Sequence, residues 1–257
     1  MRYASLGSGS AGNALVVEHG GTSVLVDCGL SVRQFEQRSA ALGFDPAGLT
    51  ALLVTHEHGD HISGVAALAR RYGVPVHLSA GTRRASCDQG LTMLPRVFEF
   101  CPGIPFAVGP FTIFPVIVPH DATEPCQFVI ATASRRLGVL TDLGHSTVHL
   151  ERHFTGLDAL HLEFNHDPAL LERSAYPPSL RARIAGPYGH LSNVQAEQLL
   201  RRIDQRQLRW LTAAHLSEKT NTPGHVQACL ARVLAAHVEH HIAAQALVSP
   251  WFDLDAV

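Results

Sequence analysis

One short turn in this chain concentrates the side chains that bind metal ions. Residues 55–61 read Thr-His-Glu-His-Gly-Asp-His, so three imidazoles and two carboxylates fall close together. The apolar run at 52–54 is typical of a buried strand, and a helical pattern follows the turn through Tyr72. Side chains at such a junction can converge on one point, and divalent ions accept both imidazole and carboxylate ligands. A solvated polar loop does not need this density of ligand types, so the turn predicts a metal site.

The spacing inside the turn divides its ligands into two directions. His56 and His58 alternate, as residues of an extended segment do, and can share one face. Asp60 and His61 lie further round the turn and can face a second point a short distance away. Residues 57 and 59, a glutamate and a glycine, are interpreted as spacers, with the glycine giving the turn its tightness.

The turn resembles a known family. His-x-His-x-Asp-His at 56–61 is similar to the motif of the metallo-β-lactamase fold superfamily. The resemblance implies an α/β fold, the four-layer αββα sandwich, with further ligands at later strand ends. Three apolar runs end at suitable residues, which are His120, Asp142 and His215. Taken alone, a histidine there is ordinary polar surface and an aspartate before glycine is an ordinary turn residue.

The resemblance also implies how the ligands are shared between two divalent metal ions. His56, His58 and His120 would hold the first ion. Asp60, His61 and His215 would hold the second, and Asp142 would bridge them. This set contains no cysteine, and both Zn²⁺ and Mn²⁺ suit it. Two ions about 3.5–4 Å apart can share a hydroxide whose pKa falls to near 7, which makes it a nucleophile at neutral pH.

Other motifs narrow the resemblance to the YycJ/WalJ-like branch, which is related to RNase Z and to PhnP-type phosphodiesterases. They lie at 7–13, 119–122, 163–167, 189–193 and 215–217. One departure is Thr220, which stands where a second asparagine is expected after Lys219. The branch implies a metal-dependent phosphodiesterase, an exonuclease that acts on DNA.

The same resemblance implies roles for individual side chains. The catalytic candidates are Asp60, His190 and His166, with His190 as the general acid that protonates the leaving group. The implied substrate-binding residues are Ser10, Asn13, Asn165, Ser192, Asn193 and Ser217. Ser192 and Asn193 could instead cap the helix predicted at 195–204.

Asp27 ends the apolar strand predicted at 23–27. It could cap the helix predicted at 31–43. In the superfamily, an aspartate at this place sits behind the ligands and orients a histidine, which a metal-bound imidazole requires. We favour the second interpretation.

The glycines at 7–12 spell Gly-x-Gly-x-x-Gly but do not predict dinucleotide binding. That motif needs a helix directly after the glycines, to hold the pyrophosphate. Here β-prone residues follow instead, and then Gly20 and Gly21 suggest a hairpin. We interpret the glycines as allowing the backbone to approach another loop or a ligand, with Asn13 bracing the loop.

Composition sets wider limits. The 257 residues suffice for a single metallo-β-lactamase fold domain over 1–257. A net charge of −2 gives no global footprint for nucleic-acid binding, so such affinity would need a local arginine patch or a homo-oligomer. The candidate residues for such an arginine patch are Arg181, Arg183, Arg201 and Arg202. Five scattered cysteines, no signal peptide and no membrane-length apolar run indicate a cytoplasmic protein that does not bind membranes.

Two rival functions use the same predicted ligands. A thioester or other small-molecule ester hydrolase of the glyoxalase II type would use the same centre, although no arm for glutathione is identifiable. A non-catalytic metal-binding protein is disfavoured because every expected ligand is present.

We predict antiparallel strands over 95–118, a hairpin over 128–140 and a closing helix over 224–241 that carries His237, His240 and His241.

Overall fold

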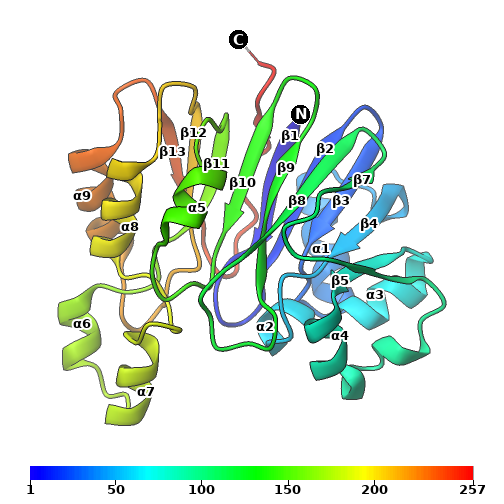
Figure 1. Cartoon of the computed structure of the whole chain (residues 1–257), viewed down its shortest axis with the longest axis horizontal. Helices are drawn as coiled ribbons and strands as arrows, with labels where there is room; N and C mark the ends of the chain where they lie inside the picture. Colours follow the sequence, from blue (N-terminus) through cyan, green and yellow to red (C-terminus); the bar gives the residue numbers. More distant parts are fainter. Residues whose placement is uncertain (257) are drawn as a thin grey trace.

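Two β-sheets packed face to face form the centre of the protein, and helices cover their outer faces (Figure 1). The computed structural model describes residues 1–256. Within them the first sheet has seven strands in the order β14-β1-β2-β3-β4-β5-β6, and the second has seven in the order β13-β12-β11-β10-β9-β8-β7. The predicted four-layer αββα sandwich is therefore confirmed.

The strands have these bounds. In the first sheet they are β1 (Arg2–Gly7), β2 (Ala14–His19), β3 (Thr22–Val26), β4 (Leu49–Leu53), β5 (Val76–Ser79), β6 (Val97–Phe100) and β14 (Phe252–Asp253). In the second they are β7 (Phe106–Val108), β8 (Phe111–Ile117), β9 (Cys126–Ala131), β10 (Arg136–Leu140), β11 (Ala159–Glu163), β12 (Trp210–Ala214) and β13 (Glu239–Ile242).

The helices divide between the two sides of the sandwich. Beside the first sheet are α1 (Val32–Leu42), α2 (Gly59–Ile62), α3 (Val65–Tyr72) and α4 (Ala80–Ala85), with short 3-10 helices at Pro46–Gly48, Cys87–Gln89 and Leu91–Met93. Beside the second sheet are α5 (Val148–His153), α8 (Asn193–Arg202) and α9 (Pro223–Val233). The helices α6 (Pro168–Arg173) and α7 (Pro178–Ile184) lie beyond the strand ends, at the lower left of Figure 1. No helix of the described chain is long and apolar enough to cross a membrane.

Alternation along the strands separates the core between the sheets from the cores beneath the helices. Val24 and Val26 of β3 face the second sheet, whereas Leu25 between them faces the helices. Successive side chains of a strand point to opposite faces, so a strand covered on both sides is apolar throughout. Phe128 of β9 is completely buried between the sheets.

Two predicted segments differ from the structure. The region 95–118 does not form only antiparallel strands, because β6 joins the first sheet parallel to β5 and only β7 and β8 form an antiparallel hairpin. The closing helix ends at Val233 instead of 241, so His240 and His241 lie on β13, which pairs with β12. In both segments, pairing with the edge strand of a sheet overrides the secondary structure that the local sequence pattern favours.

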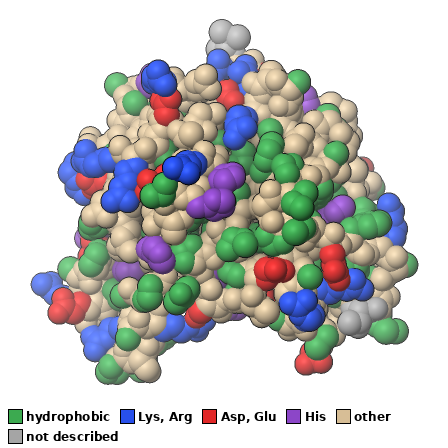
Figure 2. Space-filling model, in the orientation of Figure 1, with side chains coloured by type: hydrophobic (Ala, Val, Ile, Leu, Met, Phe, Trp, Pro, Cys, Tyr) green, Lys and Arg blue, Asp and Glu red, His purple; other side chains and the backbone are tan. Residues whose placement is uncertain are grey.

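The parallel strands β3 and β4 in the first sheet, and β10, β11 and β12 in the second, end at the same edge of the sandwich. This edge lies at the bottom of Figure 1, and both chain termini lie at the top. In the space-filling view the lower outline is hollowed between two lobes (Figure 2). The loops that carry the predicted ligands meet here.

Candidate metal centre

Three imidazoles converge in the first group of predicted ligands. The Nε2 atom of His56 lies 3.0 Å from Nδ1 of His58, and Nε2 of His120 lies 3.2 Å from that same Nδ1 atom. The three side chains can place one ligand atom each within 4.8 Å of one another. The sequence prediction that residues 56, 58 and 120 come together is therefore met by the geometry.

Neighbouring groups decide which nitrogen of these rings carries the proton. The hydroxyl of Thr55 donates to the Asp27 carboxylate at 2.7 Å, so towards Nδ1 of His56, 2.9 Å away, it can only accept. His120 donates from Nδ1 to the carbonyl oxygen of Gly189 at 3.0 Å. Neutral imidazole then has its lone pair on Nε2, so both rings aim lone pairs at the same space.

The second group brings Asp60, His61 and His215 together. The Oδ2 atom of Asp60 lies 3.3 Å from Nε2 of His215 and 3.5 Å from Nε2 of His61. On the far side of its ring, His61 donates from Nδ1 to Asp27 at 2.8 Å. Asp27 thus lies behind His61, a predicted ligand, and the lone pair of His61 also faces the centre.

Asp142 lies between the two groups. Its Oδ2 atom is 3.1 Å from Nε2 of His61, and its Oδ1 atom is 3.4 Å from Nδ1 of His215. The residue is 2% exposed, and Oδ2 has no hydrogen-bond partner among the described residues. A buried carboxylate oxygen without a donor is costly unless a cation neutralises it. Facing lone pairs and an unpartnered carboxylate fit divalent cations.

The charges of the surrounding side chains also favour bound cations at this site. Burial alone would lower the pKa of His215, but Asp142, Asp60 and Glu163 raise that pKa to about 10. Burial likewise opposes a charge on His61, yet Asp142, Asp60 and Asp27 raise its pKa well above the ordinary value. The carboxylates therefore demand positive charge at this point, which bound cations would supply.

The backbone is strained where ligands leave the strands. Among the described residues, the non-glycine residues with positive φ are Asp27 (58°), Asp142 (52°) and His215 (54°). Each directly follows or closely follows a parallel strand, and left-handed backbone turns its side chain back across the strand ends. Strain at three site residues is characteristic of functional positions.

Glycine-rich backbone holds the second group in place. A Cβ atom on Gly29 would lie 2.0 Å from the carbonyl oxygen of Asp60, so only glycine lets these two loops touch. Asn13 accepts a hydrogen bond from the Gly9 N–H at 2.8 Å, and its own N–H donates to Asp60 O at 2.8 Å. The predicted bracing by Asn13 is confirmed, and β2 in place of a helix agrees with the rejection of dinucleotide binding.

Glu163 is a site residue that the sequence reasoning missed. It is fully buried at the end of β11, and its Oε1 atom accepts hydrogen bonds from Nδ1 of His190 at 2.8 Å and of His215 at 3.0 Å. Its Oε2 atom accepts from the backbone N–H groups of Leu143 at 3.2 Å and Leu191 at 2.9 Å. An acid that ends an apolar strand was the available signal, as it was for Asp27.

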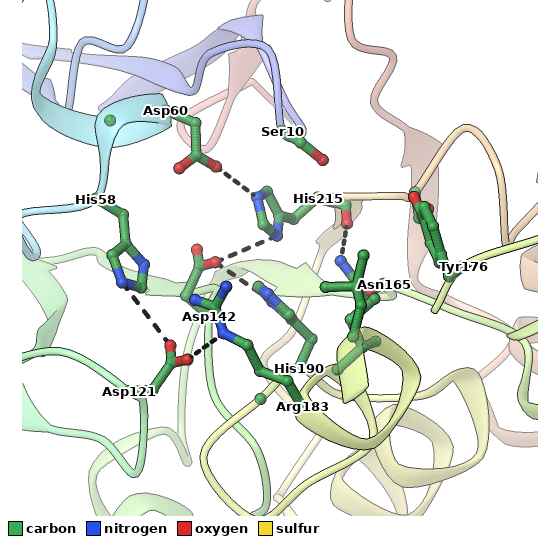
Figure 3. Close-up of a pocket in the computed structure, with 15 residues that line it drawn as sticks. Ser10, His58, Asp60, Asp121, Asp142, Asn165, Tyr176, Arg183, His190 and His215 are labelled. Carbon is green, nitrogen blue, oxygen red and sulfur yellow. Dashed lines mark hydrogen bonds and ion pairs between the residues drawn. The ribbon is translucent and has the colours of Figure 1, made fainter. Parts of the chain in front are cut away.

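His190 lies beside Asp142 with its ring in the cavity (Figure 3). Burial would lower the pKa of His190, but Glu163 and Asp142 raise it above the ordinary value. Because Nδ1 of His190 is hydrogen-bonded to Glu163, its Nε2 atom is the nitrogen available to a substrate.

Glu57 does not join either ligand group, in keeping with its interpretation as a spacer. Instead its Oε1 atom accepts hydrogen bonds from the N–H and the hydroxyl of Thr123, which ties the turn to the loop after His120. Gly59 begins α2 with no positive φ, so the tightness of the turn does not depend on glycine's backbone freedom there.

A cavity of about 380 Å³ opens onto these groups. Three of the predicted substrate-binding residues line it, namely Ser10, Asn165 and Ser217. The other three do not line it within the described chain: Asn13 braces the glycine loop, Ser192 caps α8, and Asn193 pairs with Asn221. The helix-cap interpretation of Ser192 is thus correct.

His166 is not brought to this cavity. It is 2% exposed and lines a separate depression between α6 and α7, where burial lowers its pKa from 6.5 to about 4.

The structure does not bring the four arginines of the proposed patch together. Arg183 lines the cavity, and Arg181 lines the separate depression. Arg201 forms an ion pair with Glu197 of α8, and Arg202 forms one with Glu151 of α5.

Comparison with known proteins identifies relatives of the chain. Residues 7–190 match the family model described as the metallo-beta-lactamase superfamily. The chain is 32% identical to Exodeoxyribonuclease YycJ of Bacillus anthracis, over 86% of this chain and 84% of that protein. It is also 32% identical to Exodeoxyribonuclease WalJ of Streptococcus pneumoniae, over 86% and 83%. The metallo-beta-lactamase fold protein YhfI of Bacillus subtilis shares the fold, with a TM-score of 0.74, 19% identity and coverage of 96% and 98%.

Proposed function

Because the chain belongs to the metallo-β-lactamase superfamily and is a metal-dependent hydrolase, we propose that it hydrolyses phosphodiester bonds as an exonuclease on DNA. The names of its two 32% identical relatives support this substrate. The observation that carries the proposal is the placement of His190, which Glu163 holds in the cavity beside Asp142. A phosphodiester has an alkoxide leaving group that needs a proton, and this arrangement presents a donor.

Two divalent ions, Zn²⁺ or Mn²⁺, would be held by the two ligand groups. His56, His58 and His120 form the first, and Asp60, His61 and His215 form the second, with Asp142 between them. When bound, such ions act as Lewis acids that lower the pKa of water towards neutrality and offset negative charge on phosphoryl oxygen.

The protein's own residues orient the reactants. Asp60 directs Oδ2 at His215 while its carboxylate lines the cavity, so it can accept a hydrogen bond from attacking water. Glu163 fixes the His190 ring through Nδ1, and Nε2 then delivers a proton to the leaving oxygen. The histidine works near neutral pH because carboxylates surround it.

The experiment compares diesters with good and poor leaving groups. His190→Ala should slow hydrolysis of a DNA dinucleotide, whose leaving alkoxide needs a proton, far more than hydrolysis of bis-p-nitrophenyl phosphate, whose phenolate does not. General acid catalysis contributes about 10²–10⁴-fold, which sets the expected difference. Metal content should stay at the wild-type value. Loss of metal from the variant, or equal slowing of both substrates, would refute the role of His190.

A further inference from the structure

The segment that carries α6 and α7 forms one wall of the cavity, although it contributes no residue to either ligand group. Tyr176, Leu180, Arg183 and Ile184 all line the cavity. The last three share one face of α7, because residues three and four apart are neighbours on a helix. In Figure 1 the segment lies beyond the strand ends, on one side of the hollow seen in Figure 2.

Arg183 brings a guanidinium group close to the first ligand group. Its Nε atom donates to Oδ2 of Asp121 at 2.5 Å, while Oδ1 of Asp121 lies 3.5 Å from Nε2 of His120 and 3.8 Å from Nε2 of His58. The two terminal amino groups of Arg183 make no hydrogen bond to the described residues, and Arg183 lines the same cavity as Asp142. A guanidinium anchored through Nε keeps its terminal donors for an anion, and two such donors match phosphate oxygens.

Tyr176 presents an aromatic ring at the other side of the cavity, beyond His215 in Figure 3. The ammonium of Lys219, the single lysine of the chain, lies over this ring at 5.5 Å from its centroid. A cation over the ring orients it and adds positive charge beside it. A flat aromatic surface beside positive charge is the combination that binds an unpaired base of a nucleic-acid strand.

We propose that this wall binds the nucleotide whose phosphodiester bond is cut, with Arg183 contacting the phosphate and the ring of Tyr176 stacking on the base. The inference rests on the proposed function and adds a substrate class, a strand end with an unpaired base. A cavity of about 380 Å³ lies near the lower limit of ligand sites, about 300 Å³, and so suits one terminal nucleotide better than a duplex.

The test uses two small diesters with the same leaving group. Thymidine 5′-(p-nitrophenyl phosphate) carries a base, whereas methyl p-nitrophenyl phosphate carries none. For the metal-loaded protein we define the base preference as the ratio of kcat/KM for the first to that for the second. Tyr176→Ala should lower this ratio by about 5- to 150-fold, the range expected for one stacked base. Tyr176→Leu should do the same, and Tyr176→Phe should keep the wild-type ratio.

Tyr188→Ala is the matched control, because Tyr188 is an exposed tyrosine on the loop after α7 and does not line the cavity. Arg183→Ala should lower kcat/KM for both diesters together, since both contain the phosphate. An unchanged ratio in Tyr176→Ala and Tyr176→Leu would overturn the inference while leaving the proposed function intact. If the wild-type protein cleaves neither diester, the proposed function itself fails.

Discussion

Replacing Glu163 by glutamine should weaken metal binding while the protein stays folded. The carboxylate accepts four hydrogen bonds, at 2.8 and 3.0 Å from two histidines and at 3.2 and 2.9 Å from two backbone N–H groups. Glutamine has nearly the same shape but only one accepting oxygen. One of the two pairs of donors must therefore face an amide NH₂ group.

Either orientation of that amide has a cost. If NH₂ faces the histidines, His215 must accept at Nδ1 and carry its proton on Nε2, which removes the lone pair directed at the second ion. Loss of such an outer contact lowers metal affinity by about 10- to 100-fold, or about 1.4–2.7 kcal/mol. If NH₂ faces the backbone instead, two buried N–H groups lose their acceptor, at about 1–3 kcal/mol each.

Competition with a chromogenic chelator would measure the affinity of Glu163→Gln for Zn²⁺, and circular dichroism would check its fold. Glu239→Gln is the control, since Glu239 is an exposed glutamate on β13 away from the ligands. We expect weaker binding of one ion and slower turnover in Glu163→Gln alone. Wild-type affinity for both ions in that variant would show that Glu163 does not position His215.

Three further outcomes are expected. Removing ions with a chelator should lower the Tm, and added Zn²⁺ or Mn²⁺ should restore it. At 100 times the Kd, the bound ion adds about 2.7 kcal/mol to the free energy of unfolding; a Tm independent of metal would contradict the site. Because burial lowers the pKa of His166 from 6.5 to about 4, the unfolded chain takes up this proton first as the pH falls. Protonation of His166 should therefore contribute up to about 3 kcal/mol to the decrease in the free energy of unfolding between those pH values, and urea denaturation of His166→Gln should show a decrease that is smaller by this amount. Phe128→Ala should cost about 3–5 kcal/mol in the same assay, because the ring is completely buried between the sheets; a loss below 1 kcal/mol would contradict this packing.

The ligand positions could be predicted because each combines two local signals. His120, Asp142 and His215 follow apolar runs that form β8, β10 and β12, and each has a side chain of ligand type. The family resemblance then predicted how they would divide between two ions. The role of Asp27 could be predicted in the same way, since a ligand imidazole needs a hydrogen-bond acceptor for its second nitrogen.

Other features depend on contacts between distant parts of the chain. Glu163 reaches His215 because β11 pairs with β12, and it reaches His190 on the loop before α8; no local pattern reveals either contact. The ion pair between Arg183 and Asp121 joins residues 62 positions apart. For the same reason β13 was mistaken for helix, because its pairing with β12 lies outside the sequence window.

Degradation of defined DNA by the metal-loaded protein tests the central claim most directly. The substrates would be an end-labelled linear single strand and the same sequence closed into a circle, with a glutathione thioester alongside. We predict stepwise release of nucleotides from the linear strand, no cleavage of the circle, and loss of activity in Asp142→Ala. Hydrolysis of the thioester without release of nucleotides would contradict the account.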